Sequence, residues 1–393
     1  MSRPTRTVLT GLTLWDGERR LEADTLMLVG ASIERLCTLS DLPAADAKLA
    51  VSMTGCTALP GLIDAHVHMV LDPTRSHPPA RDELPDPAAM RERAAAMVAV
   101  GITSARDLGG GHGFELDLRD DIARGAVPGP RLLCAGQPVT TVEGHCHFWG
   151  GEAADAEAAM AVVDRQQAKG VDLIKVMATG GRFTRGSKPL APQFETDTLT
   201  RIVDHARNLG YPVAAHCHGT PGIEAAVLAG VHSVEHCSWV GEAGWATDYR
   251  PEVAALMAKR GVWVSPTINR GWQRMLDAQG TTLTGMRAAL VDMRARGVAI
   301  MSSTDAGIPG VYHHHLPQAL AVFAAVAALD PEETLRSATS RAAAGLGIGG
   351  RTGRMAPGME ADVLVVDGDP TADLAALTRP VAVWARGRPV RSP

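Results

Sequence analysis

The sequence predicts an α/β fold, namely a (β/α)8 TIM barrel with a small β-sandwich domain built from both chain termini. Two observations carry this prediction. In the middle of the chain, short apolar runs typical of strands alternate with Ala-rich segments at helical spacing. At both ends the pattern is instead short β-leaning runs broken by glycine. Alternation of strands and helices indicates βαβ units and a parallel sheet, and eight such units over about 250–290 residues match the size of a barrel.

The two ends of the chain resemble each other in pattern. The N-terminal run "TVLTGLTLWDG" and the C-terminal run "PVAVWARGRPV" both favour strands over helices. We therefore expect residues 1–58 and 350–393 to pair into one composite β-sandwich domain. The catalytic barrel is then expected to occupy residues 59–349.

Eight strand-like runs are expected within the barrel. In chain order they are "LIDAHVHM", "ITSARDLGG", "RLLCAGQPVT", "VDLIKVMATGG", "YPVAAHCHG", "HSVEHCSWV", "VWVSPTIN" and "AIMSSTDAG". Helices are expected over residues 88–100, 153–169 and 197–209, and helix-length gaps separate the other runs. Gly210 fits the left-handed residue that follows a helix, and Asp330 with Pro331 fits a helix start.

Composition excludes several classes of function. The chain has 393 residues, a formal net charge of −5 and no basic block, so no nucleic-acid partner is expected. No segment has the apolar length of a membrane span or of a signal peptide, so no membrane partner is expected. The six cysteines form no CxxC pair, which favours a cytoplasmic location. Aromatic residues are only 4% of the chain, which argues against an extended stacking surface.

Histidines are the strongest chemical signal. The chain has 14 of them, and four pairs have the spacing HxH, at 66/68, 145/147, 216/218 and 313/315. Residues i and i+2 of a strand point to the same face. His66 and His68 can therefore aim two imidazoles at one point in the mouth of the barrel, as ligands of a zinc-type metal.

Further candidate ligands lie at the ends of later strands, where barrel active sites form. These are Lys175, His216, His236 and Asp305. A lysine ammonium would be costly to bury there and would repel cations. Reaction of its amine with CO2 would convert it to an anionic carbamate that can bridge two metals.

In this ordered set of motifs the chain resembles the amidohydrolase superfamily. The matching pieces are HxH at 66/68, "IKV" at 175, "AAHCHG" at 216, "EHC" at 236 and "TDAG" at 305, with "LPGLIDAHVH" and "GMEADVLVVDGDP" in the flanks. The resemblance covers nearly the whole chain. It is strongest to the branch with prolidase-like and imidazolonepropionase-like members.

The resemblance implies a binuclear centre with two divalent metal ions, usually zinc. His66, His68 and Asp305 would hold one ion, His216 and His236 would hold the other, and carboxylated Lys175 with a hydroxide would bridge them. Such ligands also suit cobalt and manganese, so the metal stays open. His216 is preferred over His218 as the ligand from its strand.

The resemblance also implies roles in catalysis. Asp305 would act as base and then as acid, and His218 would donate a hydrogen bond to the oxyanion. For substrate binding we expect His145, His147 and Trp149 to line the pocket. Arg182 is either a carboxylate clamp or part of a solvated basic loop, and His314 either contacts substrate or belongs to a polar loop.

The expected activity is hydrolysis of the C–N amide bond of a peptide, a modified peptide or an N-acyl amino acid, by attack of a metal-bridging hydroxide. Lys175 favours this over the alternative of a deaminase or cyclic-amide hydrolase acting on a heterocycle. A second alternative is an inactive scaffold that has kept the fold. The expected partner is a small-molecule or peptide substrate, and the sequence leaves a homo-oligomer open.

Overall fold

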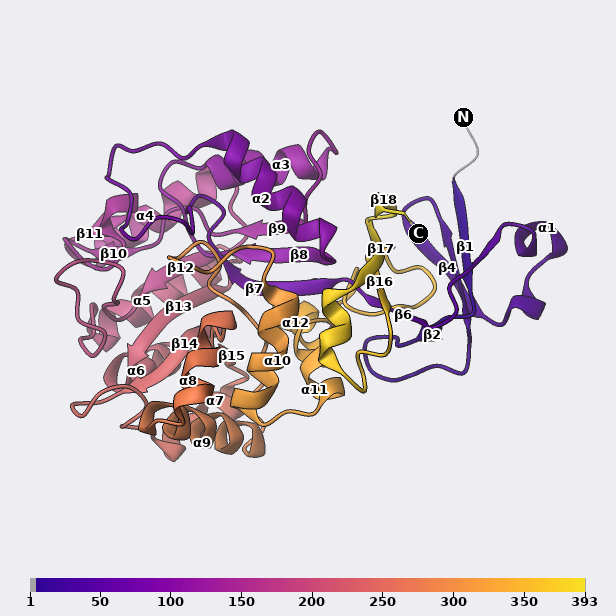
Figure 1. Cartoon of the computed structure of the whole chain (residues 1–393). Helices are drawn as coiled ribbons and strands as arrows, with labels where there is room; N and C mark the ends of the chain where they lie inside the picture. The colour runs from indigo at the N-terminus through magenta and orange to yellow at the C-terminus, as the bar shows by residue number, and fades with distance from the viewer. Residues whose placement is uncertain (1–4, 393) are drawn as a thin grey trace.

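The computed structural model describes residues 5–392 (Figure 1). The N-terminal segment forms a four-stranded sheet in the order β4-β3-β1-β5. Its strands are β1 (Arg6–Thr10), β3 (Thr25–Val29), β4 (Ser32–Cys37) and β5 (Ala50–Ser52). β3 pairs antiparallel with β1 and β4, whereas β5 runs parallel to β1. A single helical turn, α1 (Ala44–Ala47), precedes β5.

A second sheet joins the two ends of the chain. Its order is β18-β17-β16-β6-β2, with β2 (Thr13–Leu14), β6 (Cys56–Pro60), β16 (Val363–Asp367), β17 (Pro380–Ala385) and β18 (Arg388–Arg391). β16 pairs antiparallel with β6, so the expectation that the ends pair is confirmed. One apolar cluster contains residues of both sheets, among them Leu9, Leu26, Val363 and Trp384.

Parallel strands form the centre of the larger part of the molecule. One sheet contains β7 (Leu62–Val67), β8 (Ile102–Asp107) and β9 (Arg131–Cys134), and another contains β12 (Ile174–Met177), β13 (Val213–Gly219), β14 (Ser233–Val240) and β15 (Trp263–Ser265). Single parallel bridges continue the hydrogen bonding beyond them, at Val139–Val176, Val264–Ile300 and Val67–Ala306. Seven of the eight expected strands are therefore parallel strands of these two sheets.

The eighth expected strand, "AIMSSTDAG", is not a regular strand. Only Ile300 and Ala306 form bridges there. Polar side chains take the place of a strand ladder, because the Thr304 amide donates to Asp64 Oδ1 at 3.0 Å and Asn269 Nδ2 donates to the Thr304 carbonyl. Asp305 also has a φ of +62°, which interrupts extended backbone.

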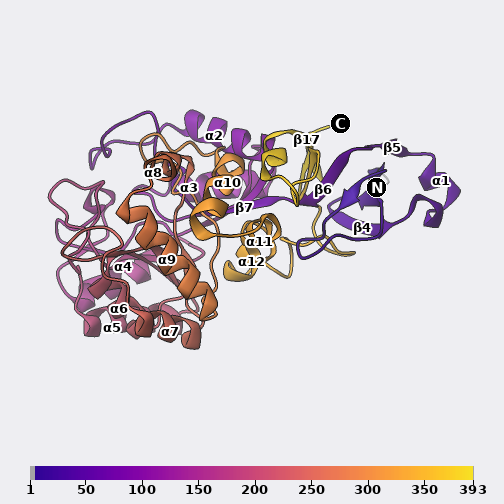
Figure 2. The same ribbon diagram turned by 60° about the horizontal axis from the view of Figure 1, so that its bottom comes forward.

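Helices surround the parallel strands (Figures 1 and 2). They are α2 (Pro87–Ala99), α3 (Phe114–Ala123), α4 (Ala156–Ala168), α5 (Thr196–Asn208), α6 (Thr220–Ala229), α7 (Pro251–Arg260), α8 (Gln273–Ala278), α9 (Thr281–Ala295), α10 (Leu316–Ala327), α11 (Pro331–Ser337) and α12 (Ser340–Gly345). The short strands β10 (Thr140–Thr141) and β11 (Glu152–Ala153) lie in the loop between β9 and α4. α2, α4 and α5 confirm the three expected helices to within three residues.

Local capping explains where several helices begin and end. The Asp330 carboxylate accepts a hydrogen bond from the Glu333 amide at the start of α11, as the sequence predicts. Gly210 follows α5 with a φ of +87°, which is the expected left-handed residue. Asp155 caps α4 at the Ala158 amide, so this helix starts three residues later than the apolar pattern suggests.

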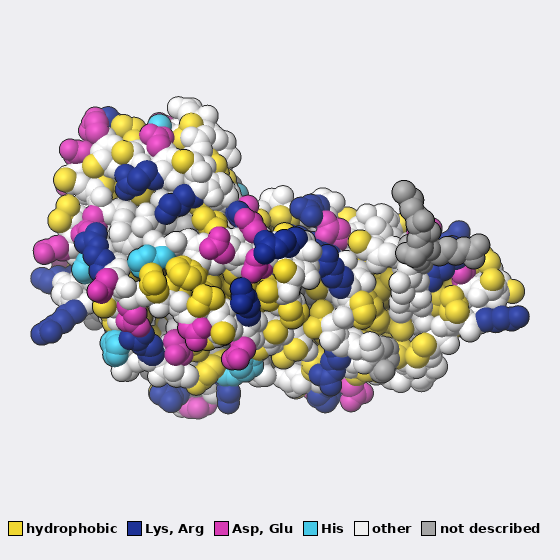
Figure 3. Space-filling view, turned by 90° about the horizontal axis from the view of Figure 1, so that it is seen from above, with side chains coloured by type: hydrophobic (Ala, Val, Ile, Leu, Met, Phe, Trp, Pro, Cys, Tyr) yellow, Lys and Arg dark blue, Asp and Glu magenta, His cyan; other side chains and the backbone are white. Residues whose placement is uncertain are grey.

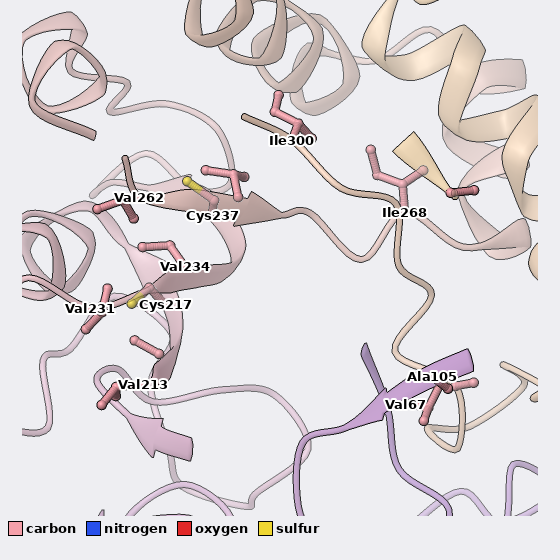
Figure 4. Packing of buried hydrophobic residues seen from close by; sticks show 14 of the residues in the cluster. Val67, Ala105, Val213, Cys217, Val231, Val234, Cys237, Val262, Ile268 and Ile300 are labelled. Carbon is pink, nitrogen blue, oxygen red and sulfur yellow. The ribbon is translucent and has the colours of Figure 1, made fainter. Parts of the chain in front are cut away.

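The largest apolar cluster lies between the parallel strands and the helices. In Figure 4, Cys217 and Cys237 pack among Val213, Val231 and Val234. Both thiols are buried and behave as small core residues. In residues 5–392, no helix combines the length and apolar character needed to cross a bilayer.

Charge is spread over the surface. Figure 3 shows an elongated molecule whose visible face mixes acidic and basic side chains. Buried ion pairs connect the two parts of the chain. Arg131 at the start of β9 donates to Asp362 Oδ2 at 2.9 Å and also pairs with Glu360.

The Arg131–Asp362 pair yields a stability prediction. Replacement Arg131→Met should lower the free energy of unfolding by about 3–5 kcal/mol, because it leaves the fully buried Asp362 carboxylate without its cation. Urea denaturation followed by circular dichroism measures this. The control Arg124→Met removes a largely exposed arginine and should change little. Equal stability of the two variants would contradict the proposed importance of the buried pair.

Candidate metal centre and substrate cavity

Three predicted metal ligands meet at one point where β7 ends. His66 Nε2 and His68 Nε2 lie 3.3 Å apart. Asp305 Oδ1 lies 3.3 Å from His66 Nε2 and 3.4 Å from His68 Nε2. Three lone-pair atoms so close together without intervening protein atoms form a set that a single cation can satisfy.

A second group of imidazoles adjoins the first. The ring centroids of His216 and His236 are 4.5 Å apart, and those of His66 and His236 are 5.1 Å apart. Ligand atoms of His66, His236 and Asp305 lie within 4.8 Å of one another, as do those of His216, His218 and His236. The structure therefore brings the expected histidines and Asp305 together, and it offers His218 as an additional neighbour.

Lys175 lines the same cavity and has an unusual environment. Its side chain is 1% exposed, and its Nζ has no hydrogen-bond partner in the described part of the chain. Burial lowers the pKa of this amine below its ordinary value. A buried amine without a partner leaves hydrogen-bonding capacity unused, which is costly unless another group occupies the space beside it.

Backbone geometry explains why these residues face one cavity. Asp64, His66 and His68 follow the two-residue alternation of β7. In β14, Glu235 points toward His66, so simple alternation would turn His236 away. His236 has a φ of +65°, and this left-handed backbone lets His236 line the cavity while Glu235 contacts His66.

Hydrogen bonds fix the orientation of each imidazole. His66 Nδ1 lies 3.0 Å from Glu235 Oε2, and His68 Nδ1 lies 3.0 Å from the Gly109 carbonyl oxygen. His236 Nδ1 lies 2.8 Å from Thr267 Oγ1, and His216 Nε2 lies 3.1 Å from the Gly180 carbonyl oxygen. In each ring one nitrogen is bound to the protein and the other is left for a metal.

Glu235 is a functional residue that motif spacing did not identify. Its carboxylate accepts hydrogen bonds from Arg106 Nη2 at 2.7 Å and from Ser233 Oγ at 2.6 Å, besides contacting His66. Burial alone would raise the pKa of Glu235, but Arg106 and His66 hold it well below its ordinary value. A buried carboxylate is thus kept ionised behind His66, a candidate metal ligand. The only sequence signal was its position immediately before His236.

Protonation states agree with metal binding. Burial is the main cause that lowers the pKa of His66 to about 4, and the nearby Lys175 adds to this effect. Burial also lowers the pKa of His216 and His236. Although burial opposes it, the neighbouring His66 and His68 lower the pKa of Asp305. Neutral imidazoles and an ionised carboxylate are the forms that bind metal.

A cavity of about 950 Å³ opens over these ligands. His145, Trp149, Arg182 and His218 line it, together with the metal-ligand candidates. The lining does not include His147 or His314. His145 is 4% exposed and its ring centroid lies 4.5 Å from that of His216. Burial lowers the pKa of His145 to about 3, so its ring is neutral at pH 7.

Several lining residues were not predicted from the sequence. They are Phe183, Trp245, Trp272, Arg274, Met275 and Met286. Most lie in loops or short helices after strand ends, where no periodic pattern marks them. Their distance along the chain from the histidine motifs hid their shared location.

Comparison with known proteins agrees with this geometry. The amidohydrolase family model matches residues 57–390. Ochratoxinase from Aspergillus niger is 27% identical over 379 residues, covering 85% of this chain and 76% of the relative. Imidazolonepropionase from Paracoccus denitrificans is 25% identical and covers 88% of each chain.

Solved structures show the same fold. A Xaa-Pro dipeptidase with bound methionine in the active site has a TM-score of 0.83 at 24% identity, covering 99% of this chain and 100% of that chain. A prolidase complexed with N-methylphosphonate-L-proline has a TM-score of 0.82 at 27% identity, covering 99% of this chain and 100% of that chain.

The chain belongs to the amidohydrolase family. It is a hydrolase that acts on amide C–N bonds.

The Glu235–His66 contact leads to a prediction about metal affinity. Replacement Glu235→Gln should weaken metal binding by roughly 10–100-fold. It removes the negative charge that makes the His66 imidazole a better electron-pair donor to the metal. Competition with a chromogenic chelator measures the affinity. The control Glu157→Gln, a largely exposed carboxylate, should leave it unchanged. Unchanged affinity in Glu235→Gln would show that this hydrogen bond does not tune the ligand.

Proposed function

We propose that this protein is a binuclear metal-dependent amidohydrolase that cleaves the amide bond of a peptide, a modified peptide or an N-acyl amino acid. The observation that carries the proposal is the convergence of His66, His68 and Asp305, with Nε2 and Oδ1 atoms 3.3–3.4 Å apart, beside a buried lysine amine that has no partner in the described chain. The first set fits one divalent ion. His216 and His236 fit a second.

We infer that the parallel strands close into a (β/α)8 barrel over residues 59–349. Three single bridges support closure. Val139–Val176 joins the segment after β9 to β12, and Val264–Ile300 and Val67–Ala306 join the segment 299–307 to β15 and to β7. Residues 1–58 and 350–393 would then form the composite β-sandwich domain. The apolar cluster that both terminal sheets share supports this.

Lys175 is proposed to carry a CO2-derived carbamate that bridges the two ions. No carboxylate lies within ion-pair distance of its Nζ among residues 5–392, although the side chain is fully enclosed. A carbamate would supply two oxygen ligands and would replace the unsatisfied amine with an anion. This accounts for a lysine at a position where a cation would repel metals.

When bound, two divalent ions of the zinc type would lower the pKa of a shared water towards ~7 and polarise the substrate carbonyl. Asp305 is proposed to accept the proton of that water and to deliver it to the leaving amine. Its carboxylate is ionised and 14% exposed, so it can exchange a proton with a bound substrate. The His66 carbonyl holds the Asp305 amide at 2.9 Å and fixes this residue in place.

His218 is proposed to stabilise the oxyanion. Its Nδ1 lies 2.9 Å from Ser238 Oγ, and the ring lines the cavity 4.5 Å from the His236 ring. If Nδ1 accepts from the serine hydroxyl, Nε2 carries the proton and can donate to the substrate oxygen. Burial lowers the pKa of His218 to about 3, so the donor is a neutral imidazole.

The substrate class rests on the relatives and on the cavity. Relatives include proteins described as a Xaa-Pro dipeptidase and a prolidase, which supports a peptide or an acylated amino acid here. Arg182, His145 and Trp149 are proposed substrate contacts, because they line the cavity. The roles of His147 and His314 in substrate binding, a cytoplasmic location and a homo-oligomer stay predictions.

Metal analysis combined with substrate screening tests the proposed function. Plasma emission spectrometry should find about two equivalents of metal, where one would indicate a deaminase-like centre and none an inactive scaffold. The metal-loaded enzyme should hydrolyse members of a panel of dipeptides and N-acyl amino acids. Release of ammonia from heterocycles without amide cleavage would overturn the proposal.

Asp305 provides a prediction for catalysis. Replacement Asp305→Asn should abolish turnover, because an amide can neither accept the water proton nor deliver it. Rates are measured by amine release with fluorescamine. The exposed aspartate Asp204 serves as control, and Asp204→Asn should keep the rate of the native enzyme. Near-native turnover by Asp305→Asn would exclude its role as proton carrier.

Lys175 provides a prediction for the bridging ligand. Replacement Lys175→Ala should lower the metal content from about two equivalents to one or none. The native protein prepared with ¹³C-bicarbonate should show a carbamate resonance in its ¹³C NMR spectrum. The variant Lys175→Ala, prepared in the same way, should lack it. Lys169→Ala changes an exposed lysine at the end of α4 and should keep both signals. A native enzyme without any carbamate resonance would refute carboxylation.

A further inference from the structure

The charged residues of the cavity are unbalanced. Apart from the candidate metal ligands, its charged lining residues are Arg182 and Arg274. The one carboxylate in the lining is Asp305, which belongs to the metal centre. In the described part of the chain, neither arginine has a carboxylate within ion-pair distance. The chain as a whole has a net charge of −5, so the excess of basic side chains in the cavity is opposite in sign to the net charge.

Arg182 is an exposed side chain that contacts an aromatic ring and no carboxylate in the described part of the chain. Its Cζ lies 5.9 Å from the centroid of the Trp245 ring, which is the geometry of a cation–π contact. The Trp245 ring in turn lies 4.7 Å from His218, edge to face. The guanidinium therefore connects the loop after β12 with the loop after β14, beside the reacting centre. A planar, pre-oriented guanidinium is suited to bind a carboxylate with two hydrogen bonds.

Aromatic side chains are concentrated at the same cavity. The chain has seven tryptophans and five phenylalanines. Three of the tryptophans and one phenylalanine line the cavity, at Trp149, Phe183, Trp245 and Trp272. Trp149 packs on His68 with ring centroids 5.1 Å apart, whereas Trp272 lines the cavity as a half-buried side chain.

Trp272 forms an apolar wall with its neighbours. Met275 and Met286 also line the cavity, and they are half-buried and buried, respectively. Thioether and indole groups make favourable contacts with aromatic rings. Several of the chain's few aromatic residues therefore lie where they can shield a substrate ring from water.

We propose that the substrate is an amide that carries both a free carboxylate and an aromatic ring, with the carboxylate on Arg182 and the ring against Trp272 and Met286. This rests on the proposed function, and it narrows that function to anionic, ring-bearing N-acyl amino acids or peptides. Neutral amides leave the Arg182 guanidinium without an anion. Amides without a ring leave the apolar wall in contact with water.

Three substrates and three matched ligands test the proposal. The substrates are N-benzoyl-L-phenylalanine, its neutral alcohol N-benzoyl-L-phenylalaninol, and N-acetylglycine, which has the acid without a ring. The ligands replace the scissile amide by a sulfonamide that the enzyme does not cleave: N-benzenesulfonyl-L-phenylalanine, the corresponding phenylalaninol, and N-methanesulfonylglycine. Calorimetry on the metal-loaded protein gives Kd, and amine release gives kcat/KM.

The native enzyme should prefer the ring-bearing acid over the alcohol by about tenfold or more, which is the scale of a hydrogen bond to a charged group. It should prefer the ring-bearing acid over the ringless acid by a similar factor, roughly tenfold or more. Equal Kd values across the three sulfonamides would overturn the proposal. A uniform kcat/KM across the three amides would overturn it as well, while the proposed amide hydrolysis would stand.

Two pairs of variants assign the preferences to residues. Arg182→Gln should bring the acid-to-alcohol ratio of Kd close to one and keep the preference for the ring. Arg185→Gln lies in the same loop but outside the lining, and it should keep both preferences. Trp272→Leu should reduce the ring preference, and Trp272→Phe should retain most of it. An unchanged acid preference in Arg182→Gln would refute the assignment of the anion site.

The two proposals can fail separately. If the sulfonamides bind with the expected preferences but the amides are not cleaved, the ligand class stands and amide hydrolysis fails. If amides are cleaved without preference for acid or ring, the proposed function stands and the ligand class fails.

Discussion

The hydrogen bonds between the end of β7 and residues 304–306 are the constraint on which the site depends. The Asp305 amide donates to the His66 carbonyl at 2.9 Å, and the His68 amide donates to the Ala306 carbonyl at 2.7 Å. These two bonds place a carboxylate from late in the chain against two imidazoles from early in the chain. Asp64 strengthens the same junction from below, because its carboxylate accepts from the amide and the hydroxyl of Thr304. Burial raises the pKa of the Asp64 carboxyl to about 7.

Two residues of the site have a strained backbone, one in the junction and one in β14. Asp305 and His236 have positive φ angles of +62° and +65°, which cost of order 1–3 kcal/mol each for residues with a side chain. Such conformations persist where the surrounding contacts over-determine them. Here they direct the side chains of Asp305 and His236 toward the cavity. A regular strand would direct only every second side chain there. The stability lost at these two positions is the cost of bringing the ligands together.

Sequence patterns predicted the strands and the residues that meet in the cavity for a common reason. Strand alternation has a strict period of two, so HxH at 66/68 defines a face without knowledge of distant contacts. The pairing of the chain ends was also predictable, because both ends carry β-leaning runs. The irregular eighth segment was not predictable, since it depends on side-chain bonds from Asp64 and Asn269 that come from other parts of the chain. Sequence patterns did not predict Glu235 and Trp272 for a similar reason. Their position in the site depends on neighbours in space and not on a local period.

The composite terminal sheet has a consequence for how the protein matures. β6 runs into β7 with only Gly61 between them, and its antiparallel partner β16 begins at Val363, some three hundred residues later. During synthesis, the strand that leads into the first two histidines therefore has only the two-residue strand β2 beside it until nearly the whole polypeptide has emerged. Contacts of such long sequence separation slow folding. The sheet that precedes the histidine pair is therefore completed only when the C-terminal strands have been synthesised.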